Sequence, residues 1–161
     1  MRVALLWWCA LNPSREVKQE SWAGALAELN KLFPLHWAEV QSTFPLEMNY
    51  SAYRNLEASG SFILVTLRED GLLVGYWSCV LSPFLHSRSI RSATTDLVFV
   101  KNGHRDYGAF GALHSKMEEV LLRSGVGLWF VGEKVANPIG PALRRLGFSP
   151  NEMVYLKRLG E

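Results

Sequence analysis

Apolar residues recur at spacings of three and four in the first third of the chain. After the break at Asn12-Pro13-Ser14, this stripe consists of Trp22, Ala25, Leu26, Leu29, Leu32 and Phe33. The spacing is typical of one face of an amphipathic helix. Pro34 predicts that this helix ends or that a turn starts, because proline disfavours helical backbone in the preceding residue. A second helix is expected over Leu35–Ser42 and a third helical piece over Tyr50–Ala58.

The pattern then changes to runs of β-forming residues. Ser61–Arg68 and Leu72–Leu81 are two such runs, separated by Glu69-Asp70-Gly71. Because Asp-Gly favours positive backbone φ angles, the two runs are predicted to form a tight β-hairpin. Further strands are expected over Ala93–Val100 and, as a short apolar one, over Val126–Val131.

Loops and helices separate the later strands. Ser82–Arg91 has the composition of a loop, and Gly103–Gly111 is a glycine-bearing loop that runs into a helix. Ser124-Gly125 ends that helix, since glycine suits the left-handed cap. A short helix over Pro138–Leu146 and a last strand over Met153–Leu159 complete the pattern.

The chain starts with MRVALLWWCAL, which has one early arginine and a short apolar run. It lacks the A-x-A cleavage site of a signal peptide, and a membrane span needs roughly 20 apolar residues. We therefore expect Met1–Leu11 to be a buried first strand. The element order β-α-α-β-β-β-α-β-α-β then predicts a single α/β domain over residues 1–161. Its sheet is mixed and mostly antiparallel, with helices packed on its faces.

Composition narrows the functional classes. With 17 basic and 15 acidic residues, the net charge of +2 supplies no bulk field for nucleic acid or an anionic membrane. The cysteines, Cys9 and Cys79, both lie in apolar runs, so we expect reduced core residues in a cytoplasmic protein. The four histidines are scattered and form no H-E-x-x-H or comparable pair, so no metal site is expected.

The segment Asp96–Leu113 is the most informative for chemistry, because a strand there meets a helix through a loop with glycines. The first turn of a helix leaves N–H groups unpaired at an electropositive end, and Arg105 adds a permanent charge. Together they predict an anion site that suits a pyrophosphate. The G-x-G-x-x-G and G-x-x-x-x-G-K-[ST] motifs are absent, so a plain strand-to-helix turn is the alternative interpretation.

The run Val100-x-x-x-His104-Arg105-x-x-Gly108, followed by a helix, resembles the acetyl-CoA loop of the GNAT-type N-acetyltransferases. That family's pattern is [Q/R]-x-x-G-x-[G/A] after a strand. Asn137, before a short helix that ends in Arg145-Leu146-Gly147-Phe148, is similar to a later segment of the family. Together with HWAEV, LREDGLLVGYW, LHS, TTDLVFV and RRLGF, these motifs resemble small acetyltransferases often encoded by bacteriophages.

The sequence departs from the family pattern at three positions. Phe110 stands where the last Gly or Ala of the loop is usual. Its ring crowds a pyrophosphate unless the loop shifts by one residue, so that Gly111 occupies the place of that last glycine. Gly140 replaces an alanine, which is a minor change. Leu143 replaces the tyrosine that protonates the departing thiolate in many members, so another group or water has to supply that proton.

The resemblance implies acetyl transfer from acetyl-CoA to an amine by direct attack. CoA is expected in the splayed gap between the parallel strands Ala93–Val100 and Val126–Val131, with the thioester carbonyl held by N–H groups near Phe99 and Val100. The loop N–H groups would hold the pyrophosphate. The expected cofactor-binding residues are Phe99, Val100, Arg105, Tyr107, Gly108, Ala109, Phe110, Gly111 and Asn137.

Direct attack needs a neutral amine and hence a base near the strand ends. The candidate bases are Asp96, Glu39 and His86. Each also has a structural interpretation: Asp96 as a loop cap or a solvent-facing residue, Glu39 as part of a solvated helix face, and His86 as an exposed loop imidazole. Tyr155 is a candidate proton donor, as is Tyr107, although Tyr155 equally suits packing on a sheet.

The other histidines and the tryptophans have simpler interpretations. His104 is expected to flank the cofactor loop, and His114, one residue from the apolar face of its helix, is expected at the surface. The six tryptophans are expected mostly in the core.

Two other functions stay open. A degenerate CoA-binding or protein-interaction domain without turnover is favoured by Phe110 and Leu143, whereas the balanced charge argues against a nucleic-acid binder. The partner expected for the leading hypothesis is an amine on a small molecule or a protein, with no membrane partner. Because this fold often dimerises, a homodimer is a further expectation.

Overall fold

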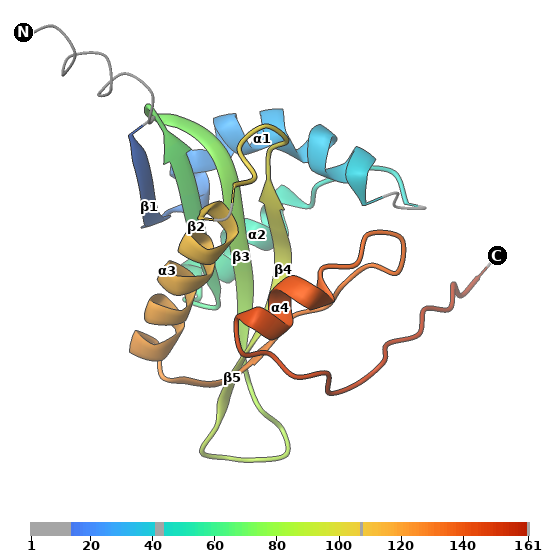
Figure 1. Ribbon diagram of the computed structural model, residues 1–161. Helices are drawn as coiled ribbons and strands as arrows, with labels where there is room; N and C mark the ends of the chain where they lie inside the picture. Colours follow the sequence, from blue (N-terminus) through green and yellow to red (C-terminus); the bar gives the residue numbers. More distant parts are fainter. Residues whose placement is uncertain (1–13, 41–43, 107, 161) are drawn as a thin grey trace, which may run out of the picture.

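The computed structural model describes residues 14–40, 44–106 and 108–160 (Figure 1). In chain order the elements are β1 (Arg15–Glu20), α1 (Trp22–Glu39), α2 (Tyr50–Ala58), β2 (Phe62–Glu69), β3 (Leu72–Pro83), β4 (Arg91–Val100), α3 (Ala109–Arg123), β5 (Val126–Phe130) and α4 (Gly140–Arg145). None of the helices in these residues is long and apolar enough to cross a membrane.

The strands form one five-stranded sheet in the order β1-β2-β3-β4-β5. Neighbouring strands are antiparallel from β1 to β4, and β4 and β5 are parallel. Helices α1 and α2 cover one face of the sheet, and α3 and α4 lie over the other (Figure 1). The mixed, mostly antiparallel sheet with helices on both faces is therefore confirmed.

Strand β2 is buried on both faces, so it contributes to two apolar clusters. Because side chains alternate across a strand, Val65 packs towards α3 and α4, whereas Leu64 packs towards α1 and α2. Trp77 and Met117 belong to the first cluster, and Trp22 belongs to the second. The prediction that tryptophans pack in the core is confirmed for Trp22 and Trp77.

The hairpin between β2 and β3 forms where the sequence predicts it. Asp70 has a φ of +49° and Gly71 a φ of +82°. Two consecutive positive φ angles are what a two-residue type I′ turn requires, and its twist matches that of the flanking strands.

Helix α1 continues through Pro34, so the predicted break at that residue is wrong. Proline lacks the N–H that would bond one turn back, but this loss falls on the exposed side of the helix. Leu32, Phe33 and His36 are buried on the other side and hold the helix against the sheet. Burial of one continuous apolar face therefore outweighs the missing hydrogen bond.

The two ends of the chain differ from the sequence prediction. The expected strand Met1–Leu11 lies outside the described residues, and β1 is the polar segment Arg15–Glu20, which sequence patterning missed. The predicted strand Met153–Leu159 is wrong, since the segment has no regular structure and runs away from β5 (Figure 1). Strand propensity depends on cross-strand neighbours, and this segment pairs with no strand in the described ranges.

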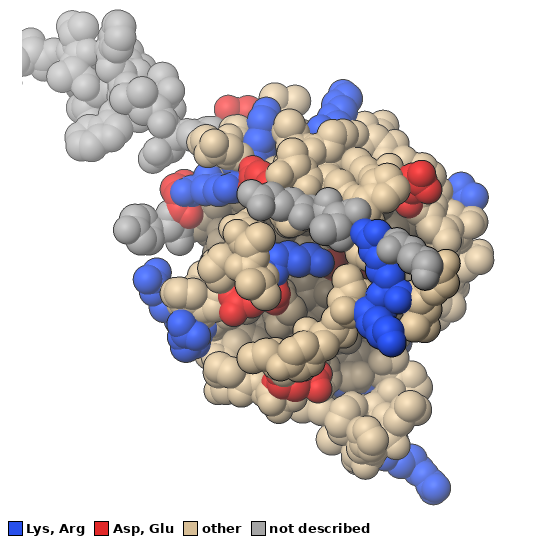
Figure 2. Space-filling view, turned by 90° about the vertical axis from the view of Figure 1, so that its right-hand side faces the viewer, with Lys and Arg blue, Asp and Glu red and all other residues tan. Residues whose placement is uncertain are grey.

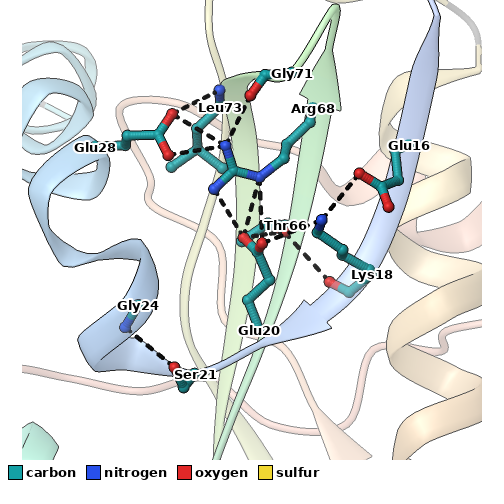
Figure 3. Close-up of polar contacts among 10 residues, drawn as sticks. All are labelled: Glu16, Lys18, Glu20, Ser21, Gly24, Glu28, Thr66, Arg68, Gly71 and Leu73. Atoms are coloured by element: carbon teal, nitrogen blue, oxygen red, sulfur yellow. Dashed lines mark hydrogen bonds and ion pairs between the residues drawn. The ribbon is translucent and has the colours of Figure 1, made fainter.

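A charged network fixes α1 to the β2–β3 hairpin (Figure 3). The Arg68 guanidinium on β2 lies 3.0 Å from Glu20 Oε2 at the end of β1 and 2.8 Å from Glu28 Oε1 on α1. It also donates to Gly71 O at 2.9 Å, and Leu73 N donates to Glu28 at 3.2 Å. One arginine thus ties three elements together on the side of the sheet that carries α1.

Candidate active site

Strands β4 and β5 diverge at the carboxyl end of their pairing. The parallel register runs from Arg91↔Val126 to Thr94↔Phe130, and β4 then continues to Val100 beside β3 alone. A cavity of about 690 Å³ opens along this part of β4. Figure 2 shows the corresponding face of the molecule hollowed, with acidic and basic side chains at the edges of the hollow.

The cavity walls come from α1, α2, β4, the start of α3 and the segment between β5 and α4. Chemically functional side chains on these walls are His36, Glu39, Glu47, Tyr53, Thr95, Asp96, Arg105, Asp106, Glu133, Lys134 and Asn137. Acidic side chains outnumber basic ones, because only Arg105 and Lys134 carry positive charge among those that line it.

Asp96 lies at a β-bulge in β4. Ser78 pairs with Leu97 and Cys79 pairs with Thr95, so Asp96 is the extra residue between them. Such bulges bend a strand and redirect a side chain. The hydroxyl of Tyr53 donates to Asp96 Oδ2 at 2.8 Å, and Ser78 Oγ donates to the same oxygen at 3.4 Å.

The pKa of Asp96 is raised, chiefly because the surrounding protein desolvates the carboxyl, while the bonds from Tyr53 and Ser78 oppose that shift. The side chain nevertheless keeps an open side, since the residue is exposed and lines the cavity. A carboxylate with raised pKa and an open side is a better proton acceptor than an ordinary surface aspartate.

Main-chain N–H groups of β4 point into the gap left by β5. Lys101 N donates to Val74 O at 2.8 Å, towards β3. Since alternate residues of an antiparallel strand direct their N–H groups to opposite sides, those of Val100 and Val98 point away from β3. Phe99 lines the cavity with its ring, which stacks on His36 with a centroid distance of 4.9 Å.

Arg105 and Glu39, predicted from separate segments, form an ion pair at the cavity. The Arg105 Nε donates to Val100 O at 2.6 Å, and the guanidinium carbon lies 5.6 Å from the centre of the Phe99 ring. The arginine is therefore oriented by three partners and turned towards the cavity.

The first turn of α3 already holds an anion, the carboxylate of Asp106. Its Oδ1 accepts from Gly108 N at 3.0 Å and from Ala109 N at 2.9 Å. Phe110 lines the cavity and packs against Trp77 at 5.0 Å between ring centroids. A side chain built at Gly111 would meet nothing within 4 Å, so the backbone there is open. Tyr107 lies outside the described residues.

Thr95 ties three strands together where β4 and β5 diverge. Its Oγ1 accepts from Trp77 Nε1 at 2.9 Å and from Trp129 Nε1 at 3.0 Å. His114 stacks on Trp129 at 5.2 Å and is buried, so its predicted surface position is wrong. The imidazole closes the apolar cluster beneath the cavity, and burial lowers its pKa.

His86 and Tyr155 lie away from the cavity. His86 is in the loop 84–90 between β3 and β4, with its ring 5.4 Å from that of Phe84 (Figure 1). Tyr155 is 85% exposed in the irregular C-terminal segment. Asn137 does line the cavity, in a loop closed by a bond from its own N to Lys134 O at 3.0 Å. Of the four candidate catalytic residues, the structure brings together Asp96 and Glu39.

The sequence interpretation missed several cavity residues, among them His36 and Tyr53. His36 Nδ1 lies 2.8 Å from the hydroxyl of Tyr76, and burial lowers the pKa of His36 to about 4. His36 follows Leu32 and Phe33 by one helical turn, so it continues the apolar stripe of the helix. This spacing is the sequence signal that indicates a buried position for His36. Nothing in the sequence connects Tyr53 with Asp96, which is 43 residues away.

In the part of the chain that the structure describes, no group of three or more His, Cys, Asp and Glu side chains is arranged to hold a metal ion.

Comparison of the sequence with models of protein families gave no match, and comparison with curated proteins gave none. Solved structures do match. An aminoglycoside acetyltransferase from an uncultured soil metagenomic sample is 19% identical, with a TM-score of 0.72 over 92% of this chain and 99% of the other. A ribosomal-protein-alanine N-acetyltransferase from Brucella melitensis biovar Abortus 2308 is 17% identical, with a TM-score of 0.75 over 92% of this chain and 99% of the other.

A third match, the aminoglycoside N-acetyltransferase AAC(6')-Iy in complex with CoA, is 15% identical, with a TM-score of 0.74 over 93% of this chain and 97% of the other. The chain therefore has the fold of the GNAT-type N-acetyltransferases, as the loop and strand motifs predict. This class of fold is defined by its mixed sheet and by the parallel strand pair that diverges at the cavity.

Proposed function

We propose that the protein is an N-acetyltransferase that moves the acetyl group of acetyl-CoA to an amine by direct attack. The observation that carries this proposal is the cavity at the divergence of β4 and β5. It combines outward N–H groups of β4 with the carboxylate of Asp96. A protein of the same fold has been solved with CoA bound, which supports the choice of co-substrate.

The residues present fit the acyl end of acetyl-CoA. The N–H groups of Val98 and Val100 point into the gap and can donate to a thioester carbonyl. Donors fixed by a strand need no reorganisation as negative charge develops on that oxygen. Phe110 and Ala142 supply apolar wall for the chain that carries the thiol.

Asp96 is the proposed base. The amine nitrogen forms a bond to the carbonyl carbon, its surplus proton passes to the Asp96 carboxylate, and the carbon–sulfur bond breaks. Leu143 is buried in the core cluster and cannot donate a proton, so the thiolate takes its proton from water. Tyr53 holds Asp96 Oδ2 and leaves the other carboxylate oxygen for the substrate.

The acceptor is proposed to be an amine that also carries a second, cationic group, while its reacting nitrogen is neutral. Glu39 is paired with Arg105, and Glu133 accepts from the N–H groups of Ile139 and Gly140, so both are engaged within the protein. Glu47 and Asp96 line the same cavity and form no ion pair with other residues in the described ranges. A substrate with a second ammonium group would place it at Glu47 while its reacting nitrogen faces Asp96.

A CoA-binding protein without turnover is the second candidate. It is favoured by the buried Leu143, which stands in place of a proton donor. Release of CoA thiol distinguishes the two.

The purified protein is mixed with acetyl-CoA and a panel of diamines, polyamines and amino sugars, with the corresponding alcohols as controls. Transfer predicts thiol release that requires an amine and a product heavier by one acetyl group. Binding of acetyl-CoA with no release above the alcohol controls supports the second candidate. The absence of any binding contradicts both.

A further inference from the structure

The start of α3 carries its own anion in the free protein. Asp106 Oδ1 accepts from the N–H groups of Gly108 and Ala109, at 3.0 and 2.9 Å. These donors belong to the loop that resembles the acetyl-CoA loop of the GNAT-type N-acetyltransferases and is expected to hold the diphosphate of acetyl-CoA. The same electropositive end of the helix therefore attracts two anions, one internal and one on the ligand.

Arg15 holds Asp106 in this position. Its Nη1 donates to Asp106 Oδ1 at 2.9 Å and its Nη2 to Oδ2 at 2.7 Å. The guanidinium is anchored from behind by Glu69, whose Oε1 accepts from Nε at 3.1 Å, and the second oxygen of Glu69 lies 2.5 Å from His104 Nδ1. The hydrogen bond from Arg15 is the largest cause of the lowered pKa of Asp106, so this carboxyl is ionised at neutral pH.

The ion pair also fills the space beside the loop glycine. A Cβ added at Gly108 would lie 3.2 Å from Arg15 Nη1 and 3.5 Å from Asp106 Oδ1. The room that glycine leaves for a ligand is thus taken by the protein's own charged groups. The Asp106 side chain is 60% exposed, so it can rotate off the helix without disturbing the core.

We propose that the Asp106 carboxylate competes with the diphosphate of acetyl-CoA for the N–H groups of Gly108 and Ala109. The carboxylate must leave these groups before the ligand occupies them. The proposal rests on the proposed function and adds an affinity-setting residue to it. Arg15 keeps its bonds to the displaced carboxylate, so the displaced anion retains a charged partner. Displacing the Asp106 carboxylate costs free energy, so acetyl-CoA binds more weakly than it would to an unoccupied helix start.

Binding of acetyl-CoA and of acetyl-pantetheine, which lacks the diphosphate, is measured by calorimetry for the wild type, Asp106→Ala and Asp106→Asn. Asp106→Ala is expected to bind acetyl-CoA about 10-fold more tightly, as the loss of a competing helix cap and its charge implies. Asp106→Asn, which keeps a capping oxygen without the charge, should fall between the two. Acetyl-pantetheine should bind all three proteins equally.

Glu119→Ala is the matched control, because it removes the same charge from the far half of α3, where Glu119 pairs with Lys116 and Arg123. Its affinity for acetyl-CoA should equal that of the wild type. If the wild type binds acetyl-CoA and folded Asp106→Ala binds it no more tightly, the competitor proposal is wrong and the proposed function stands. If neither the wild type nor any variant binds acetyl-CoA, both are overturned.

Discussion

The hydroxyl of Tyr53 on α2 lies 2.8 Å from Oδ2 of Asp96 on β4, across the mouth of the cavity. This bond fixes one carboxylate oxygen, and the other accepts no hydrogen bond from the residues that the structure describes. It also stabilises the ionised form of Asp96 against the desolvation that raises its pKa. The hydrogen bond from Tyr53 thus affects both which oxygen of Asp96 is available to the substrate and the pKa of the proposed base.

Tyr53→Phe is expected to move the acid limb of the pH profile of kcat/KM to higher pH. The hydrogen bond lowers the pKa of Asp96, so its loss lets that pKa rise, and the base becomes protonated at a higher pH. A charge-assisted hydrogen bond implies a movement of about one pH unit. Tyr50→Phe is the control on the same helix, since its hydroxyl bonds to Asn30, and it should leave the profile in place.

Asp96→Asn should lower kcat/KM for the amine by about 10²- to 10⁴-fold, which is the usual contribution of a general base. Acetyl-CoA affinity should stay within the wild-type range, because Asp96 faces the amine side of the cavity. Rates and affinities are measured on the same preparation. Transfer at the wild-type rate by Asp96→Asn assigns proton removal to another group.

His36 is expected to make the protein less stable in mild acid. Its pKa is lowered from 6.5 to about 4, mainly by desolvation, so the unfolded chain binds a proton between these values that the folded protein does not. Stability attributable to His36 is therefore present above pH 6.5 and is lost as the pH falls towards 4.

Over that window the loss amounts to about 3 kcal/mol of unfolding free energy. Denaturant unfolding of His36→Gln, which does not titrate, should show a correspondingly weaker dependence on pH. Identical slopes for the wild type and His36→Gln would show that His36 titrates normally in the folded protein.

Arg105→Glu should weaken acetyl-CoA binding by about 10- to 100-fold, because a carboxylate replaces a charged donor next to the expected diphosphate. The ion pair with Glu39 offers a stricter test. The double variant Arg105→Glu, Glu39→Arg restores an ion pair but not the position of the cation, so its affinity should stay low. Recovery of affinity in the double variant would mean that Arg105 acts only through Glu39.

Removing Arg68 should destabilise the junction of α1 with the hairpin. Arg68→Met leaves the carboxylates of Glu20 and Glu28 without their shared cation. The expected cost is about 2 kcal/mol, less than for a fully buried pair because both glutamates keep contact with solvent. Lys18→Met, at the exposed edge of the same network, should cost less than Arg68→Met.

Sequence patterning predicted the parts of the fold that local chemistry determines. Asp70 and Gly71 specify their turn through positive φ angles, and Ser61–Arg68 has the β-formers of a buried strand. The failures lie where distant contacts decide. Pro34 stays inside α1 because neighbouring residues are buried, and β1 exists because β2 offers it an edge. Met153–Leu159 has the composition of a strand but pairs with no strand of the described residues.

The candidate site was predicted in the same uneven way. Arg105 and Gly108 follow a local motif, and Asp96 and Glu39 were candidates for their place near the strand ends. The bonds from Tyr53 to Asp96 and from Arg15 to Asp106 join residues 43 and 91 positions apart. Only the packing of the helices and strands brings such groups together, so no spacing in the sequence reports them.

The most direct test of the central claim is a crystal structure of the protein with acetyl-CoA. The proposed function predicts the thioester carbonyl oxygen at about 3 Å from the N–H of Val98 or Val100, with the acetyl carbon facing Asp96. The diphosphate should lie at the start of α3, with Asp106 displaced from the N–H groups of Gly108 and Ala109. Acetyl-CoA bound outside the gap between β4 and β5, or with its thioester away from Asp96, would contradict the account.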